Sequence, residues 1–142
     1  MAPAPLALLL LRASRWFDRQ LLDGLQREGW PMLSPAQSLV FAHLDAEGVP
    51  PAELARRLGH TRQATQDLLV GLVRLDLVAL EPNPERRGGR LVVLTDRGRV
   101  LTADAQRLLT DLEESLGAGL VDQLRGLLLT LNEGCNSRSE SA

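Results

Sequence analysis

Residues 53–80 read ELARRLGHTRQATQDLLVGLVRLDLVAL, and this pattern predicts two short helices separated by a tight turn. Proline is favoured at the first position of a helix, so we expect the first of them to begin at Pro51. Gly59 ends it, because glycine readily adopts the left-handed conformation that closes a helix. Thr61 then caps a second helix that runs to about Leu75. Two helices joined in this way form a helix-turn-helix.

The next part of the chain predicts a β-hairpin. Residues 77–80 and 90–94 are the short apolar runs LVAL and RLVVL, and the turn-rich, basic segment 82–89 separates them. Apolar runs of this length, bounded by proline and glycine, are typical of strands joined by a loop. Thr95 follows the second run and is placed to cap a further helix.

The N-terminal third of the chain predicts two more helices. Apolar residues recur every three or four positions over residues 6–25 and form one helical stripe. This long helix ends near Gly29. Ser34 and Pro35 are a helix cap followed by a proline at the first helical position, and they begin a helix that extends to about Asp45.

The C-terminal part predicts two helices that are rich in leucine. Residues 101–116 and 120–131 keep helical spacing, and a glycine-containing break separates them. The helices at the two ends of the chain carry more apolar surface than a small central domain can cover. We therefore expect them to pair with the same helices of a second copy, giving a homodimer. Residues 134–142 are expected to form a disordered tail.

The charge of the chain is unevenly distributed. The formal net charge is −2, yet residues 51–100 hold nine arginines against six acids, a local net of +3. All 16 basic residues of the chain are arginine. The apolar run of residues 6–11 is too short to span a bilayer and has no preceding positive charge, so we expect a cytoplasmic protein.

Several kinds of site have no support in the sequence. Cys135 is the only cysteine, which excludes an intramolecular disulfide and a thiolate metal cluster. The two histidines, His43 and His60, lack the paired acidic spacing of a metal site. We also find no serine-histidine-acid arrangement and no phosphate-binding glycine loop. The expectation is a protein that is not an enzyme and has no catalytic residue, metal or cofactor.

The order of these elements resembles the multiple antibiotic resistance regulator (MarR) family over nearly the whole chain, most specifically over residues 53–99. The resemblance implies a mainly α fold with a small β-hairpin wing (α+β), that is, a winged helix-turn-helix with dimerisation helices at both ends. We divide this single structural domain into dimerisation helix 1–30, DNA-binding region 31–98, dimerisation helices 99–133 and tail 134–142. The implied function is that of a transcriptional regulator, most often a repressor. A two-fold dimer of this type binds an inverted-repeat operator with half-sites about ten base pairs apart.

The second helix of the helix-turn-helix carries the candidate base-reading residues. Arg62, Gln63 and Gln66 lie on its outward face, where arginine pairs with guanine and glutamine with adenine in the major groove. Thr61 caps the helix, and the backbone N–H groups beside it suit a phosphate. Asp67 departs from the basic residue that many relatives carry, so we expect it to face away from DNA or to hold a neighbouring arginine.

The wing has its own candidate residues. An arginine at a hairpin tip can enter the narrow minor groove, where the negative potential is concentrated, and Arg87 is the first candidate. Arg86 and Arg90 are expected to contact phosphates. Family resemblance places Glu85 as the salt-bridge partner that holds the loop. The glycines at 88 and 89 stand where relatives more often carry charge.

The resemblance also implies a small, often aromatic, effector that binds between the dimerisation helices and the winged region. Trp16, Trp30, Phe41 and His43 are the residues that could line its pocket. Ordinary packing between helices is the alternative for the same four residues.

Two other functions remain open at this stage. One is a winged-helix module that binds another protein and no longer binds DNA, consistent with the acidic total charge and with Asp67. The other is an enzyme or thiol sensor built on Cys135, which requires a base near the thiol.

Overall fold

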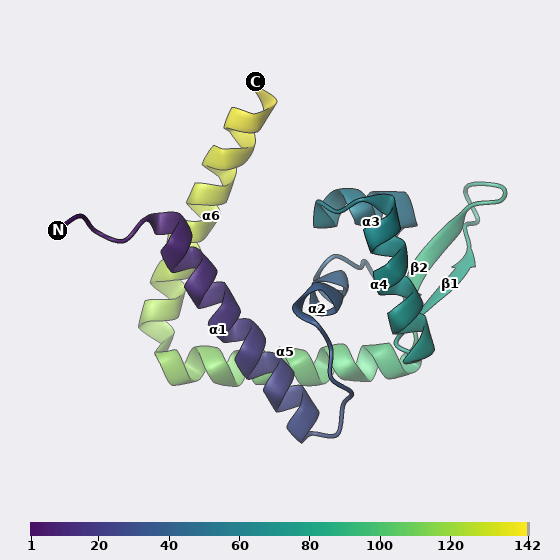
Figure 1. The fold of residues 1–142 in the computed structure, drawn as a ribbon, viewed down its shortest axis with the longest axis horizontal. Coiled ribbons are helices and arrows are strands. Elements are labelled where there is room, and N and C mark those ends of the chain that lie inside the picture. The colour runs from purple at the N-terminus through teal and green to yellow at the C-terminus, as the bar shows by residue number, and fades with distance from the viewer. Residues whose placement is uncertain (142) are drawn as a thin grey trace. The chain divides into compact units, whose positions relative to one another are not determined.

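The computed structural model describes residues 1–141, which fold into six helices and one two-stranded sheet (Figure 1). The elements are α1 (Leu6–Arg27), α2 (Pro35–Ala42), α3 (Pro51–Leu58), α4 (Arg62–Arg74), β1 (Val78–Pro82), β2 (Arg90–Leu94), α5 (Asp96–Leu116) and α6 (Ala118–Glu140). They belong to two compact units, residues 1–108 and the residues from Leu109 onward. The predicted class, mainly α with a small β-hairpin, is confirmed.

The helix boundaries in the first unit follow the capping residues. Ser34 accepts a hydrogen bond from the Gln37 N–H at 3.1 Å, and the Gln37 side chain accepts one from the Ser34 N–H at 3.0 Å, which completes a capping box at α2. Gly59 closes α3 in the left-handed region with φ of 68°. α2 ends at Ala42, three residues before the predicted end, where His43 N–H bonds back to the Val40 carbonyl in a tighter turn.

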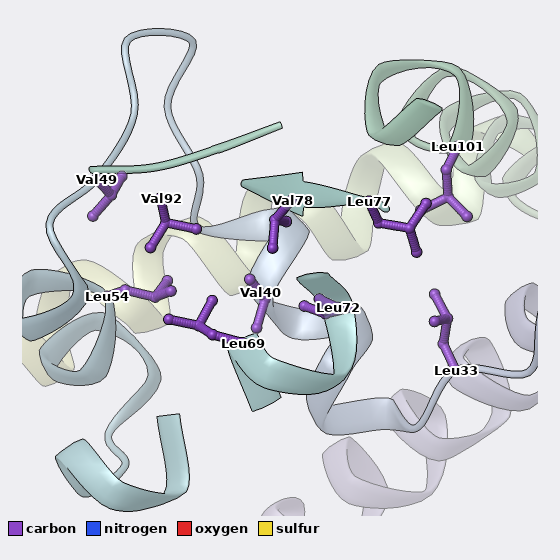
Figure 2. Close-up of a cluster of buried hydrophobic side chains, with 10 residues drawn as sticks. All are labelled: Leu33, Val40, Val49, Leu54, Leu69, Leu72, Leu77, Val78, Val92 and Leu101. Carbon is purple, nitrogen blue, oxygen red and sulfur yellow. The ribbon is translucent and has the colours of Figure 1, made fainter. Parts of the chain in front are cut away.

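The core of the first unit lies between the helix-turn-helix, the hairpin and the start of α5 (Figure 2). Its buried members are Leu33, Val40, Val49, Leu54, Leu69, Leu72, Leu77, Val78, Val92 and Leu101. Thr65 is the one buried polar residue in the described chain, and its hydroxyl donates to the Thr61 carbonyl at 2.9 Å. Burial of one leucine side chain contributes roughly 2 kcal/mol to the free energy of folding. The shared core therefore holds α4 and the hairpin in a fixed arrangement.

The hairpin has a third partner at the middle of its second strand. β1 and β2 pair antiparallel, with Val78 opposite Leu94 and Leu80 opposite Val92. Val49, in the loop between α2 and α3, forms a bridge with Val92 through hydrogen bonds of 3.0 and 2.8 Å. The middle of β2 is therefore bonded to the loop that leads into α3 as well as to β1.

The start of α5 packs tightly against the start of β1. Thr95 accepts a hydrogen bond from the Gly98 N–H at 3.0 Å and donates one to the Asp76 carbonyl at 2.6 Å. Gly98 is buried, and a Cβ built on it would lie 2.0 Å from the Leu77 carbonyl oxygen. Only glycine allows the helix and the strand to approach this closely.

The end of α1 is joined to α5 by polar contacts around Trp30. The Trp30 indole donates to the Asp104 carboxylate at 2.8 Å, and the Arg97 guanidinium lies 5.1 Å from the centre of the Trp30 ring. Arg107 pairs with Glu28 at 2.6 Å. These contacts hold the two helices together within residues 1–108.

The second unit contains the end of α5 and the whole of α6. Arg125 pairs with Glu113 at 2.7 Å and with Asp122 at 3.5 Å. α6 continues through Glu140, so a helix stands where the sequence predicted the disordered tail 134–142; residue 142 itself lies outside the described residues. Ser137 and Ser139 donate to carbonyls one turn back, which is compatible with helix. No helix among residues 1–141 is long and apolar enough to cross a membrane.

Candidate nucleic-acid interface

The N-terminal turn of α4 presents the three candidate base-reading residues to solvent. Thr61 has extended backbone angles, and its hydroxyl accepts a hydrogen bond from the Ala64 N–H at 3.1 Å, which fixes where the helix begins. Arg62, Gln63 and Gln66 are exposed. On the opposite face, Leu69 and Leu72 are buried in the core. The helix is anchored by one face and offers a polar face of the size that fits a major groove.

Asp67 has a different partner from the one expected. Gln63 donates from Nε2 to the Asp67 Oδ1 at 3.0 Å, one helical turn away. Of the two alternatives predicted for Asp67, an ion pair with a neighbouring arginine is not found among the described residues, and the glutamine amide one turn away lies within reach instead. The other alternative, that Asp67 faces away from DNA, stays a prediction. The sequence could have predicted this contact, because Gln63 and Asp67 are four residues apart in a predicted helix and so lie on the same face.

The hairpin loop exposes its three candidate arginines beside α4. The hairpin packs against α4 (Figure 1), and Arg86, Arg87 and Arg90 are all exposed. Gly88 has a positive φ of 76°, which the turn at the tip requires. An exposed, basic tip of this kind is suited to the minor groove.

The loop keeps its shape through backbone contacts and one asparagine. Asn83 N–H bonds to the Gly89 carbonyl at 2.9 Å, and the Asn83 side chain accepts from the Glu85 N–H at 3.0 Å. The salt bridge expected from Glu85 to an arginine is absent from the described residues. The asparagine turn closes the loop without it and leaves Arg87 available.

Some arginines of the basic middle segment are engaged within the protein. Glu53 accepts hydrogen bonds from Arg56 and Arg57, which lower the pKa of its carboxyl to about 2. Arg57 also binds Asp45 at 3.1 Å and the His43 carbonyl at 3.0 Å. Arg56 and Arg57 are exposed as well, but they are paired with acids, whereas no ion pair is found for Arg62, Arg86, Arg87 or Arg90 among the described residues. The count of charges, a local net of +3, cannot make this distinction.

The four candidate pocket residues lie in different surroundings. Trp16 lines an open groove of about 660 Å³ on α1, together with Arg12, Arg15, Asp18, Arg19, Leu22 and Pro35. Trp30 is held by Asp104 and Arg97, and Phe41 packs on the core. His43 ends α2, and its carbonyl accepts from Arg57. Among the four, only Trp16 is part of this groove, and sequence reasoning missed the arginines that share it.

Known proteins are similar to this chain in both sequence and structure. Residues 33–87 match the model of the MarR family. Two solved structures resemble the chain over most of its length: the transcriptional repressor CouR bound to a 23-mer DNA duplex (30% identity, 90% of this chain and 92% of that one, TM-score 0.72), and wild-type MarR from E. coli without ligand (28% identity, 92% and 98%, TM-score 0.70).

A curated relative adds sequence similarity without a known role. An uncharacterised protein of Mycobacterium tuberculosis is 38% identical over 86 residues, which is 60% of this chain and 54% of that protein. The chain thus spans about half the length of the curated relatives it matches.

The helix-turn-helix, the hairpin beside it and the flanking helices define a winged helix-turn-helix protein of the kind found in transcriptional regulators. The chain belongs to the MarR family. The resemblance stated from residues 53–99 is confirmed. No group of three or more metal-ligating side chains occurs in the part of the chain that is described.

Proposed function

We propose that the protein is a sequence-specific DNA-binding transcriptional regulator that acts as a repressor and not as an enzyme. One observation carries the proposal: the exposed polar turn of α4 and the arginine-bearing hairpin are fixed side by side on a single core. The polar turn of α4 is suited to base edges in the major groove, and the arginines of the hairpin are suited to the minor groove. The similarity to a repressor bound to duplex DNA supports the same role. Such a protein works where the chromosome lies, so we place it in the cytoplasm.

The exposed leucines support a homodimer. α1 exposes leucines 6, 8, 9, 10 and 11, and one stripe of α6 exposes leucines 120, 124, 127, 128 and 131. Helices that expose this many leucines are rare on soluble monomers, which favours an interface on each of the two helices. A symmetric pair of chains presents two copies of α4, which fits an inverted-repeat operator with half-sites about ten base pairs apart.

A DNA titration tests the regulator function. Fluorescence anisotropy of the full chain with its own upstream DNA, at two salt concentrations, is expected to show selective binding that weakens with salt. Arg62→Ala should weaken binding about tenfold by removing a base contact. Arg87→Ala should weaken binding and make the slope of log affinity against log salt concentration less steep by about one. Arg138→Ala, the same charge change in α6, is the matched control and should bind as the wild type does.

Two results would contradict this function. Binding that ignores DNA sequence, or no binding at all, would favour a winged-helix module for protein partners. Equal losses in Arg138→Ala and Arg62→Ala would show that the arginines act through total charge alone.

The groove on α1 supports a small-molecule effector of defined chemistry. Three arginines, Arg12, Arg15 and Arg19, line it beside the Trp16 ring. Guanidinium groups bind carboxylates, and an indole stacks on a flat ring, so the groove suits an aromatic carboxylate.

This effector role is tested by release of bound DNA. Titrating the protein–DNA complex with substituted benzoates is expected to lower the anisotropy, and the double variant Arg15→Ala/Arg19→Ala should require at least about tenfold more ligand. Arg27→Ala removes an arginine from the same helix outside the groove residues and is the control. Release at unchanged concentrations in the double variant would exclude this groove.

A further inference from the structure

The contact between Gln63 and Asp67 fixes the orientation of a base-reading side chain. Gln63 Nε2 lies 3.0 Å from Asp67 Oδ1, and both side chains are exposed on the same outward face of α4. A carboxylate only accepts hydrogen bonds, whereas a glutamine amide has two N–H donors and one carbonyl acceptor. Asp67 therefore holds the amide with its nitrogen toward the acid. The Gln63 Oε1 and the second N–H remain for a ligand.

We propose that Asp67 is a positioning residue that restricts Gln63 to reading adenine. This inference rests on the proposed DNA-binding function and concerns the same surface. In the major groove, adenine presents the N6 amino donor beside the N7 acceptor. The fixed Gln63 amide matches both: its Oε1 accepts from N6, and its remaining N–H donates to N7.

The same geometry disfavours guanine. Guanine presents two acceptors, O6 and N7, at the corresponding positions. An amide free to rotate can turn its NH₂ group toward them, but the Asp67 contact keeps Oε1 outward. The oxygen would then face another oxygen with no proton between them, which leaves both groups without a partner. Asp67 thus adds discrimination at one base pair in each half-site.

The charge of Asp67 has a second effect on DNA binding in general. An exposed carboxylate on the DNA-reading face repels phosphates and weakens binding to every sequence. It lowers non-specific affinity while it sharpens the selection of adenine. These two effects predict opposite changes in affinity and in selectivity when the acid is neutralised.

Selection of binding sites from a randomised duplex library tests the role, with the full-length protein in wild-type, Asp67→Asn and Gln63→Ala forms. The wild type should enrich adenine at one position of each half-site, and Gln63→Ala should lose that preference. Asp67→Asn keeps the shape of the side chain but can donate as well as accept. It should bind the library more tightly and lose adenine-over-guanine preference at that position by at least about fivefold, while other positions stay unchanged. Asp23→Asn, an equal charge change on α1, is the control and should match the wild type.

The outcomes separate this inference from the function on which it rests. If the wild type selects a motif but Asp67→Asn keeps the full adenine preference, Asp67 has no positioning role and the regulator function stands. The inference is also overturned if the wild type selects a motif and Gln63→Ala selects the same motif with the same base preferences. If the wild type selects no motif, the DNA-binding function fails first. Circular dichroism of each variant shows that α4 is still folded.

Discussion

Gly98→Ala is expected to destabilise the protein by at least about 3 kcal/mol, the largest effect of any single methyl group that we foresee. The added carbon would lie 2.0 Å from the Leu77 carbonyl oxygen and 3.1 Å from its carbonyl carbon. These are backbone atoms, so no side-chain rotation relieves the contact. α5 and β1 would have to separate, which also breaks the 3.2 Å bond from the Thr95 N–H to the Leu77 carbonyl. Urea unfolding at one fixed protein concentration measures the loss.

Gly134→Ala is the matched control for this substitution. Gly134 lies within α6, and apart from its chain neighbours and the backbone of its own helix turn, no described atom stands within 4 Å of the added carbon. Alanine is favoured over glycine inside a helix by up to about 1 kcal/mol, so the control should be as stable as the wild type or more so. A Gly98→Ala protein with the unfolding midpoint of the wild type would show that α5 and β1 are not in close contact.

Leu124→Glu combined with Leu127→Glu is expected to convert the dimer into monomers and to weaken operator binding at least about 100-fold. These leucines are 47% and 62% exposed in the single chain and share one stripe of α6 with Leu120 and Leu131. Charges on that stripe would be buried without partners in a dimer. In a dimer, binding of one half-site places the second chain at a high effective concentration near the other half-site, and separate monomers lose this advantage. Light scattering reports the mass, and anisotropy reports the affinity.

Leu129→Glu is the control for the dimer prediction, because Leu129 lies on the opposite side of α6, between Asp122, Arg125 and Glu133 on a helical projection. It should remain dimeric and bind DNA as the wild type does. A double variant that keeps the dimer mass at micromolar concentration would show that this stripe is not the interface. Equal dissociation in Leu129→Glu would place the interface on both faces of α6.

Much of the fold was predictable from the sequence because its boundaries are set by local chemistry. Ser34 with Pro35, Gly59 and Thr61 mark helix ends through their own hydrogen bonds or backbone preferences, which depend on few neighbours. Gly98 could not be interpreted in the same way. Its role depends on the approach of Leu77, a residue 21 positions away, and nothing in the sequence near Gly98 signals that approach.

The candidate interface was predictable in its residues and less so in its contacts. Arg62, Gln66 and Arg87 are exposed where the helical and hairpin patterns put them, and their contact with DNA remains a prediction. An arginine partner was one of two alternatives for Asp67, and the structure gives Gln63, four residues earlier, as its partner instead. The hydrogen bond from Trp30 to Asp104 could not be read from the sequence, because the two residues are 74 positions apart.

The bridge between Val49 and Val92 has a consequence for how such a protein can evolve. The middle of β2 is bonded to the loop before α3, while the hydrogen bonds of residues 83–89 are formed within their own turn. Insertions, deletions or new charges in those seven residues leave α4 in place. Under the proposed function, we expect natural variation at the tip to change the overall affinity for DNA and to leave unchanged the base preference that we propose for α4.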